Sequence, residues 1–535
     1  MLAGTIPGLM QPRQLNISAI LQFAAIAHPE QEIVSRSVGE PIWRGNYAQC
    51  HDRAAQGAHW LASLGVAAGD RVSSLAWNTH RHFELFFTVP GIGAVLHTAN
   101  PRLPDDHIAY TINTAGSHVL LYDRNMAAII DRLRPSIPAV KHYVMLSADD
   151  YDARIAPFST SIGWPEIDEY AGAFLCFTSG TTGDPKGVLY SHRSVVLHAM
   201  MGGQSGAFGF SAFDVILPCS SLYHATAWGL PFSGTINGSK WVFPADRMDG
   251  ESLQELIADE GVTFSCGVPT IWTMYLDHLR RTGETTGSLE RIVIGGSAVP
   301  RSMAAQFRED HGVEVRQLWG MTETSPIGVL SSPTPRIAAL GPEEMSELIW
   351  SRQGRLQYGI ELRIIGNDGS SLPHDGQSAG ALMVRGPWVV ERYFNSESSA
   401  CDVDGWFDTG DVATIDANGF LRLTDRSKDV IKSGGEWISS IDLENLAAAC
   451  PGVKVAAVVG VFHPKWEERP ILIVEKHEDA VLTERMITAW LGERTVKWWM
   501  PDRIIFESVP MTATGKIDKK AIRAKHGAIL SSPAG

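Results

Sequence analysis

The run at residues 178–188, Thr-Ser-Gly-Thr-Thr-Gly-Asp-Pro-Lys-Gly-Val, has the residue types that an anionic ligand needs. Its three glycines let the backbone come close to a ligand. Apolar segments at 174–177 and 188–190 flank the run, so the pattern predicts a strand-loop-strand cradle for phosphate. Hydroxyl and ammonium donors for anionic oxygens come from Thr178, Ser179, Thr181, Thr182 and Lys186.

This loop differs from a Walker A loop, in which Gly-Lys-Ser/Thr opens a helix. Here Pro185 precedes Lys186, and Gly-Val-Leu-Tyr follows with the character of a strand. The alternative interpretation is a glycine-rich hairpin whose polar side chains face water.

Four further polar motifs follow, and together with the loop they resemble the motif set of the adenylate-forming superfamily. That family includes acyl-CoA synthetases, peptide-synthetase adenylation domains and beetle luciferases. The motifs occur in the family's order, whereas the stretch before Thr178 carries none of comparable specificity. They are Leu318-Trp-Gly-Met-Thr-Glu-Thr324, Trp406-Phe-Asp-Thr-Gly-Asp411, Asp425-Arg-Ser-Lys-Asp429 and Thr514-Gly-Lys516.

Helix and strand patterns alternate through the first four hundred residues and predict an α/β fold with helix-covered sheets. Helical spacing covers Tyr47–Leu64 and resumes at His82–Phe87. Buried strands are expected at Arg71–Trp77, Val119–Asp123, Val215–Pro218, Val262–Cys266 and Arg291–Gly295.

After Lys428 the pattern of expected helices and strands changes to that of a small α+β domain. Helices are expected at Ser439–Ala449 and Thr483–Leu491, and strands at Val453–Val461 and Ile471–Lys476. The resemblance implies a large multi-sheet N-terminal domain, residues 1–427, that binds the acid and ATP. It also implies a small mobile C-terminal lid, residues 428–535, with its hinge at Lys428.

The resemblance implies that ATP converts a carboxylic acid into an acyl-adenylate, whose leaving group is AMP. Asp411 would accept the ribose hydroxyls with its two oxygens, and Arg426 would add a second ribose contact. Gly295 and Gly296, which follow an apolar strand, would let adenine lie against the backbone. Taken alone, this glycine pair could equally form a tight strand-to-helix turn. The expected ATP- and AMP-binding residues are Thr178, Ser179, Gly180, Thr181, Thr182, Lys186, Gly295, Gly296, Ser297, Trp319, Gly320, Met321, Thr322, Asp411 and Arg426.

A metal site and a lysine carry the expected charge chemistry of this step. Glu323 matches the family's magnesium-binding glutamate, and Thr178 is the second candidate ligand for Mg²⁺, directly or through water. Lys516 is expected to bridge the substrate carboxylate and the α-phosphate, for which a charge on a flexible stem is suited. The neighbouring Lys519 and Lys520 are predicted to be exposed tail lysines.

The acid and CoA sites are implied by resemblance alone. His224 and Gly320 match positions at the acid site, and Trp228 matches a tryptophan that gates the acyl channel in fatty acyl-CoA synthetases. A core tryptophan is the alternative for Trp228. Lys432 is expected to serve the second half-reaction, after the lid has rotated. The loop expected to line the pantetheine tunnel contributes Gly434, Gly435 and Trp437.

Composition limits the partners. The chain has 535 residues, which implies more than one domain, and a net charge of −14. From Lys428 onward 15 Lys and Arg face 14 Asp and Glu, a charge of +1, which leaves −15 for the part before it. An acidic body argues against nucleic acid as a partner. The six cysteines have no C-x-x-C pair, which suits reduced thiols in a cytoplasmic protein without a zinc site.

No signal peptide is expected, because residues 1–14 lack a basic region followed by an apolar run. No membrane span is expected, because the longest apolar stretch, residues 85–96, is short and interrupted. The sequence leaves the oligomeric state open, although related fatty acyl-CoA synthetases are often homodimers.

These observations predict an AMP-forming acyl-CoA ligase with a small-molecule acid, ATP and CoA as substrates. The segment at residues 77–102 and Lys497-Trp-Trp-Met-Pro-Asp502 resemble bacterial short- and medium-chain acyl-CoA ligases, a subgroup that includes 3-methylmercaptopropionyl-CoA ligases. The acid is therefore expected to be short or medium in chain length, 3-methylthiopropionate included. An aryl acid, another acyl acceptor, a luciferase-type oxygenase and a catalytically dead nucleotide-binding regulator are the alternatives.

Overall fold

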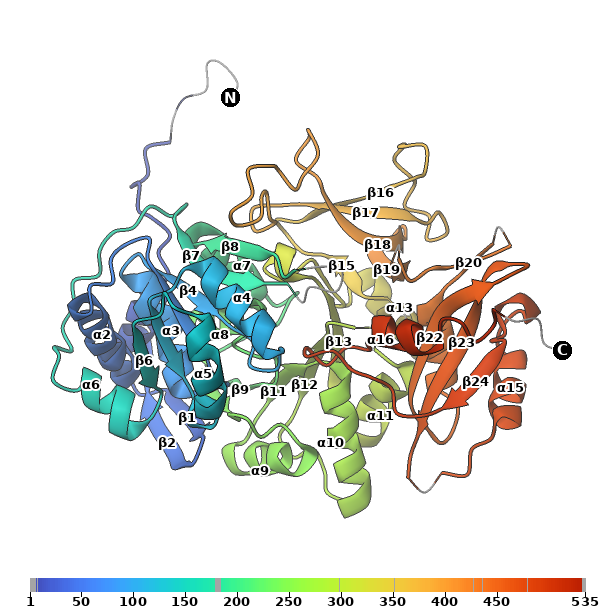
Figure 1. Cartoon of the computed structure of the whole chain (residues 1–535), viewed down its shortest axis with the longest axis horizontal. Helices are drawn as coiled ribbons and strands as arrows, with labels where there is room; N and C mark the ends of the chain where they lie inside the picture. The colour runs from blue at the N-terminus through green and yellow to red at the C-terminus, as the bar shows by residue number, and fades with distance from the viewer. Residues whose placement is uncertain are drawn as a thin grey trace.

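The computed structural model describes residues 6, 8–178, 184–297, 299–350, 352–426, 428–434, 436–478 and 480–531. Its strands form three sheets (Figure 1), two before Lys428, in what we call the body, and one after it, in what we call the lid. The expected α/β architecture with a smaller C-terminal domain is confirmed.

The six-stranded sheet of the body has the order β6-β5-β3-β4-β7-β8. Its neighbours run parallel except β7 and β8, which pair antiparallel. The expected strands that it contains are short and almost wholly buried, as is typical of parallel sheets covered on both faces. Its strands are β3 (Arg71–Leu75), β4 (Val95–Thr98), β5 (Val119–Tyr122), β6 (His142–Met145), β7 (Gly172–Phe177) and β8 (Gly187–Ser191).

The thirteen-stranded sheet has the order β16-β17-β18-β19-β15-β14-β13-β12-β11-β9-β10-β1-β2. Its parallel part runs from β13 to β1, and the antiparallel part ends in β16. The strands are β1 (Glu32–Ser37), β2 (Glu40–Asn46), β9 (Val215–Pro218), β10 (Lys240–Phe243), β11 (Phe264–Gly267), β12 (Arg291–Gly295), β13 (Glu314–Trp319), β14 (Val329–Leu330), β15 (Gly354–Leu356), β16 (Glu361–Ile365), β17 (Gly380–Arg385), β18 (Phe407–Ile415) and β19 (Phe420–Arg426).

The lid sheet has the order β21-β20-β23-β22, with β24 beside β23. The long β22–β23 hairpin forms its centre, and its apolar residues pack against α14 and α15. The strands are β20 (Ile431–Ser433), β21 (Glu436–Ile438), β22 (Val453–His463), β23 (Glu467–Lys476) and β24 (Arg503–Phe506).

The helices cover the sheets, and their ends follow ordinary capping chemistry. Asn46 caps α2 by accepting from the Gln49 N–H, and Gly261 ends α9 with a left-handed φ of 68°. No helix in the described part of the chain is both long and apolar enough to cross a bilayer. The α-helices are α1 (Ser18–Ala27), α2 (Tyr47–Ser63), α3 (His80–Gly91), α4 (Asp105–Ala115), α5 (Ala127–Leu133), α6 (Ala153–Ile155), α7 (His192–Gly202), α8 (Leu230–Ile236), α9 (Gly250–Glu260), α10 (Pro269–Thr282), α11 (Arg301–His311), α12 (Pro335–Ala338), α13 (Pro342–Trp350), α14 (Ser440–Ala448), α15 (Glu484–Gly492) and α16 (Lys519–His526).

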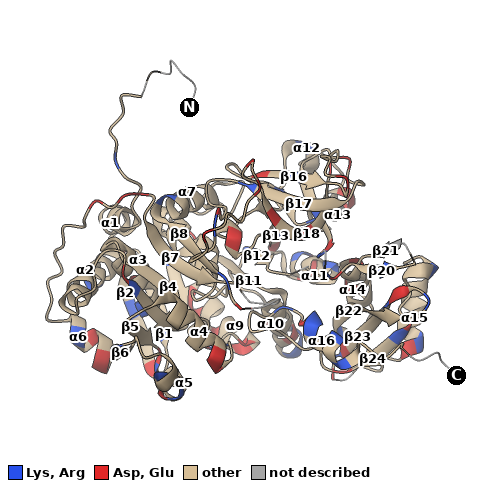
Figure 2. Cartoon of the chain, turned by 45° about the horizontal axis from the view of Figure 1, so that its top comes forward, with Lys and Arg blue, Asp and Glu red and all other residues tan. Residues whose placement is uncertain are grey.

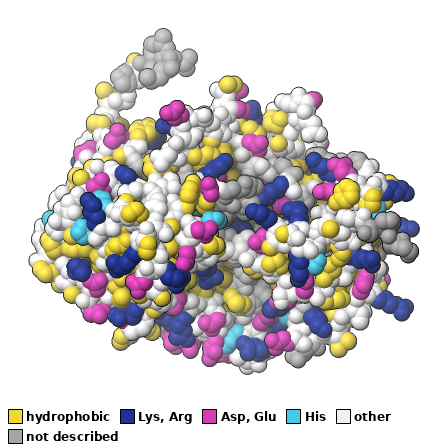
Figure 3. Space-filling model, viewed as in Figure 1, with side chains coloured by type: hydrophobic (Ala, Val, Ile, Leu, Met, Phe, Trp, Pro, Cys, Tyr) yellow, Lys and Arg dark blue, Asp and Glu magenta, His cyan; other side chains and the backbone are white. Residues whose placement is uncertain are grey.

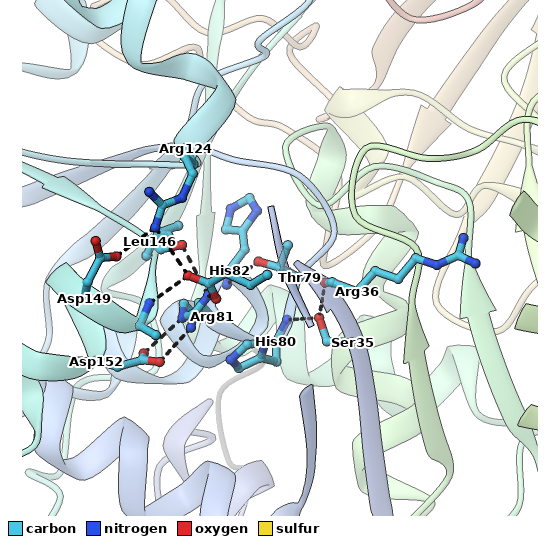
Figure 4. Close-up of polar contacts among 12 residues, drawn as sticks. Ser35, Arg36, Thr79, His80, Arg81, His82, Arg124, Leu146, Asp149 and Asp152 are labelled. Carbon is cyan, nitrogen blue, oxygen red and sulfur yellow. Dashed lines mark hydrogen bonds and ion pairs between the residues drawn. The ribbon is translucent and has the colours of Figure 1, made fainter. Parts of the chain in front are cut away.

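Helix α3 is buried along its whole length, and its residue Arg81 is paired with a carboxylate (Figure 4). Arg81 makes two hydrogen bonds to Asp152, at 3.0 and 2.6 Å, and the His80 N–H donates to Ser35 at 3.0 Å. Because an unpaired buried charge is strongly destabilising, these pairs fix how α3 sits between the two sheets of the body. We assign this cluster a structural role.

Several strands of the body end at one place. β12 and β13 are parallel neighbours, and the glycine-rich turn at Gly296 follows the first while Gly320 follows the second. In the other sheet β7 ends at Phe177, directly before Thr178. In open α/β sheets ligands bind beyond the carboxyl ends of the strands, and the motifs singled out in the sequence lie at such ends.

Candidate active site

Two adjoining cavities lie between the body and the lid, with volumes of about 470 and 310 Å³. Figure 3 shows Lys and Arg side chains gathered beside the hollow between these two parts, and Figure 2 shows basic residues of α16 at the same junction. Residues common to both linings come from four separate motifs. They are Gly296, Leu318, Gly320, Arg426, Lys428 and Lys516.

Most of the residues expected from the sequence meet at these cavities. The larger cavity is lined by Thr178, Lys186, His224, Trp228, Gly296, Gly320, Met321, Thr322, Glu323, Arg426, Lys428 and Lys516. The smaller cavity adds Ser297, Trp319 and Asp411, and Gly295 is the last residue of β12 beside them. Residues 179–182 of the phosphate loop lie outside the described residues, as do Gly435 and the side chain of Trp437.

The ends of the phosphate loop are held by its two strands. Phe177 of β7 pairs with Gly187 of β8, as the flanking apolar runs predicted. The Thr178 N–H donates to the Lys186 carbonyl at 2.9 Å, and the Lys186 N–H returns a bond to Thr178 Oγ1 at 3.1 Å. The Lys186 ammonium lies over the ring of Tyr393, 4.8 Å from its centre. Both predicted loop ends therefore face the larger cavity from fixed positions.

Tyr393 is a site residue that the sequence motifs did not indicate. Its hydroxyl donates to Glu323 Oε1 at 2.9 Å, and burial together with this carboxylate raises the pKa of Tyr393. It therefore stays protonated and orients Glu323. No motif surrounds Tyr393, which lies in the connection between β17 and β18; only its aromatic neighbour Phe394 gives a local signal of burial.

Glu323 occupies a short 3₁₀ turn after Gly320 and is 7% exposed. A Cβ on Gly320 would lie 1.3 Å from the Pro326 carbonyl oxygen, so this turn admits only glycine. Tyr190 supports the same turn by donating to the Thr322 carbonyl at 2.6 Å. Within the described residues no group of three His, Cys, Asp or Glu side chains could hold a metal ion, so a cation here would need oxygens from a ligand.

Asp411 is oriented by one partner on each oxygen. Trp319 Nε1 donates to Oδ2 at 2.9 Å, and Arg426 Nε lies 3.1 Å from Oδ1. Burial raises the pKa of Asp411, and the neighbouring Arg426 and Trp319 oppose that rise. Asp411 lines the smaller cavity together with Ser297, and a carboxylate with two oxygens can accept two neighbouring hydroxyls.

Lys516 projects from a turn of the lid into both cavities. The turn is closed by the Thr512 N–H, which donates to the Lys516 carbonyl at 2.7 Å, and by Gly515, whose φ is 76°. Burial and Arg426 lower the pKa of Lys516 to about 8, opposed by Asp411 and Glu323. The ammonium therefore sits among the groups that the sequence assigned to the nucleotide.

His224 begins an unusual turn at the wall of the larger cavity. The four residues 225–228 and Gly229 all have positive φ, from 45° at Ala225 to 73° at Gly229. Left-handed backbone costs a non-glycine residue about 1–2 kcal/mol. Trp228 thereby reaches the cavity while only 6% of its surface stays exposed, so it belongs to the core and to the cavity wall at once. Burial and Lys516 lower the pKa of His224 to about 4, which leaves the imidazole neutral at pH 7.

Other expected residues lie away from the cavities. Lys432 is exposed on β20 and Gly434 lies just after that strand; neither lines either of these two cavities. A Cβ on Gly434 would lie 3.1 Å from Trp466 and 3.2 Å from Trp498, so this loop packs on tryptophans of the lid. The structure thus separates Lys432 and Gly434 from Lys516.

The prediction for Lys519 was wrong. Its side chain is 13% exposed, and its ammonium lies 2.9 Å from Glu444 and 2.5 Å from Ser440 Oγ. Helix α16 packs against β22 within the lid, and a buried lysine there requires the carboxylate that α14 supplies. Lys520, in contrast, is exposed as expected.

Comparisons with known proteins agree with this arrangement. The family model for AMP-binding enzymes matches residues 22–394, and that for the AMP-binding enzyme C-terminal domain matches residues 442–516. The chain is 42% identical to the 3-methylmercaptopropionyl-CoA ligase of Ruegeria pomeroyi, covering 98% of this chain and 99% of the relative. It is also 42% identical to the medium-chain-fatty-acid–CoA ligase of Ectopseudomonas oleovorans, covering 98% of both.

Among solved structures, the anthranilate CoA ligase AuaEII in complex with anthranoyl-AMP has the same fold, with a TM-score of 0.87. The similarity covers 98% of this chain and 99% of that one at 23% sequence identity.

Proposed function

The chain belongs to the AMP-binding enzyme family, and from this premise we propose that it is an AMP-forming acyl-CoA ligase. In the first half-reaction a carboxylate oxygen of the acid attacks the α-phosphorus of ATP, the bond to the bridging oxygen breaks, and diphosphate leaves. In the second, the thiolate of CoA attacks the acyl carbonyl carbon and AMP leaves. The balance is acid, ATP and CoA in, and acyl-CoA, AMP and diphosphate out.

The position of Lys516 carries this proposal. Lys516 and Arg426 line both cavities, Asp411 lines the smaller one and Glu323 the larger one, and these residues come from motifs far apart in the sequence. A cation fixed in a partly desolvated site stabilises the negative charge that develops at the α-phosphate. Asp411 would hold the ribose, Ser297 and Gly296 would border the adenine, and Thr322 would donate to the α-phosphate.

We propose that magnesium enters with ATP and is held by Glu323. The carboxylate is oriented by Tyr393, and Thr178 lines the same cavity. Phosphate oxygens would complete the six oxygen ligands that Mg²⁺ requires, which suits a site with one protein carboxylate. Lys186 and the hydroxyls of the phosphate loop would bind the β- and γ-phosphates.

We propose a short- or medium-chain acid as the substrate. The acyl pocket is assigned to His224, Trp228 and Gly320, and neutral His224 brings no charge that would favour a second carboxylate on the acid. The equal identities to a thioether-acid ligase and a medium-chain ligase support 3-methylthiopropionate and medium-chain fatty acids alike. The bulk of Trp228 at the wall favours the shorter acids.

For the second half-reaction we propose that the lid turns about Lys428. Lys432, Gly434, Gly435 and Trp437 would then replace Lys516 at the active site and line the path of the pantetheine arm. The separation of Lys432 from Lys516 supports this assignment, because each could meet the site in a different orientation of the lid. We also propose that the enzyme is cytoplasmic, where ATP and CoA are available, and homodimeric.

A screen of acids tests the proposal. Linear, thioether and aryl acids are incubated with ATP, Mg²⁺ and CoA, and AMP and thioester are measured together. The proposal predicts equimolar AMP and acyl-CoA with a short or medium acid. Nucleotide binding without acid-dependent diphosphate release from any acid would contradict it and favour a regulator.

A further inference from the structure

The start of α14, in the lid, is held by the end of β19, in the body. The buried part of this contact is Asp425, which is 1% exposed and accepts from the Ser440 N–H at 2.6 Å. Ser440 is the first residue of α14, so the carboxylate binds one of the N–H groups that a helix leaves without an intrahelical partner. The negative charge of Asp425 also interacts favourably with the positive end of the helix dipole at the start of α14.

The outer part of the contact adds two more links. Arg422 Nη2 donates to both carboxylate oxygens of Asp442, at 2.8 and 2.9 Å. Ser439 donates from Oγ to the Thr424 carbonyl at 2.6 Å. We call these six residues, three on β19 and three at the start of α14, the β19–α14 latch: Arg422, Thr424, Asp425, Ser439, Ser440 and Asp442.

The latch spans the proposed hinge. Every β19 member precedes Lys428, and every α14 member follows it. Rotation about the backbone of Lys428 would carry α14 away from β19, so the latch can exist in one lid orientation and not in the other. Figure 2 shows α14 on the side of the lid that faces the body.

The latch is connected to Lys516 through Lys519. Helix α16 begins at Lys519, directly after the turn that carries Lys516. The Lys519 ammonium contacts Ser440 Oγ at 2.5 Å and Glu444 at 2.9 Å, and it is attracted by Asp425. Lys519 therefore links the α14 end of the latch to the base of the Lys516 turn.

From this geometry we infer that the β19–α14 latch positions Lys516 for adenylation and sets the balance between the two half-reactions. The inference rests on the proposed function. Asp425 borders the smaller cavity, and the latch acts by stabilising the lid orientation in which Lys516 meets Asp411. Releasing the latch should favour the orientation needed for thioester formation.

The test compares the half-reactions in Asp442→Ala and Asp425→Asn. Adenylation is followed as acid-dependent exchange between diphosphate and ATP, and thioester formation is followed from synthetic acyl-adenylate and CoA. The Arg422–Asp442 pair is partly exposed, so its loss should slow exchange by a factor of about two to five. Asp425→Asn should slow exchange about tenfold, because a buried charge partner of Lys519 is lost. Thioester formation should stay unchanged or become faster in both variants.

Two comparisons separate positioning from damage to the fold. The control variant Glu361→Ala breaks an exposed ion pair between Glu361 on β16 and Arg385 on β17, which are 2.7 Å apart and remote from the lid. It should leave the ratio of the exchange rate to the thioester-formation rate unchanged. The double variant of Arg422→Ala with Asp442→Ala should be no slower in exchange than either single variant, because one interaction is removed once. Equal slowing of both half-reactions in Asp442→Ala and Asp425→Asn, or no change in either, would overturn the inference.

Lid orientation can be read without catalysis. Tyr358 in the body and Val481 in the lid are 95% and 85% exposed, and dyes on Tyr358→Cys and Val481→Cys report their separation by energy transfer. The partly exposed native thiol is first removed as Cys401→Ser. Asp425→Asn should change the distribution of energy-transfer efficiencies relative to the parent protein. An unchanged distribution would contradict the inference that the latch sets the lid orientation. Absent acid-dependent exchange in the parent protein would instead contradict the proposed function, so the two failures are distinguishable.

Discussion

Arg426 Nε lies 3.1 Å from Asp411 Oδ1, in a pair of residues that face each other across β18 and β19. The pair joins the expected ribose-binding carboxylate to the last residue of the body's sheet, just before Lys428. Both charges act on Lys516: Arg426 lowers its pKa and Asp411 raises it. The proposed ribose-binding residues, next to the start of the lid, therefore influence the charge of the proposed catalytic Lys516.

The pKa of Lys516 predicts a pH limit for adenylation. Below about 8 the ammonium is charged and can stabilise the α-phosphate; above that pH the charge is lost. The kcat/KM for diphosphate–ATP exchange, which reports free enzyme, should fall with a midpoint near pH 8. His224, with a pKa of about 4, should contribute no step between pH 6 and pH 8. Lys516→Arg should remove the alkaline limb, because guanidinium stays charged; a limb that persists in this variant belongs to another group.

Glu323→Gln should raise the magnesium concentration needed for half-maximal exchange by about tenfold or more, because the amide keeps the shape but loses the charge that binds the cation. Tyr393→Phe removes the hydroxyl that orients the carboxylate and should raise that concentration less. An unchanged magnesium dependence in Glu323→Gln would remove Glu323 from the metal site.

Trp228→Ala should shift the preferred acid towards longer chains. Removing the indole from the cavity wall enlarges the pocket and weakens the contact with short acids, by about 1–3 kcal/mol in kcat/KM. The measurement is kcat/KM for a series of linear acids. A parallel loss for every chain length would assign Trp228 to the core alone.

The left-handed turn predicts an unusual stability effect. Ala227 has a φ of 50° and is fully buried, so Ala227→Gly should relieve backbone strain of about 1–2 kcal/mol. This relief offsets two losses of stability: the buried methyl group is removed, and the unfolded chain gains conformational entropy. Ala58, equally buried, lies inside α2, where Ala58→Gly brings no such relief. Thermal unfolding should therefore show a lower Tm for Ala58→Gly than for Ala227→Gly. Equal losses would mean that the turn stores no strain.

The sequence predicted those parts of the site whose signals are local. The strands beside the phosphate loop follow from the apolar runs at 174–177 and 188–190, and Gly320 stands where a side chain has no room. Tyr393 was not predicted as a site residue, because its contact with Glu323 joins segments 70 residues apart and no local sequence pattern indicates such a contact. Lys519 was misjudged for the same reason: its partner Glu444 lies on a different helix. The left-handed turn at 225–228 has no glycine before Gly229 and so gives no turn signal.

The central claim is that one lid presents Lys516 to adenylation and Lys432 to thioester formation. The most direct measurement assays both half-reactions in Lys516→Ala and Lys432→Ala. Lys516→Ala should lose diphosphate–ATP exchange by several orders of magnitude, because a charge that stabilises the transition state is removed, yet still convert supplied acyl-adenylate to acyl-CoA. Lys432→Ala should keep exchange and slow thioester formation. If Lys516→Ala damaged both half-reactions equally, the two-orientation account would be contradicted.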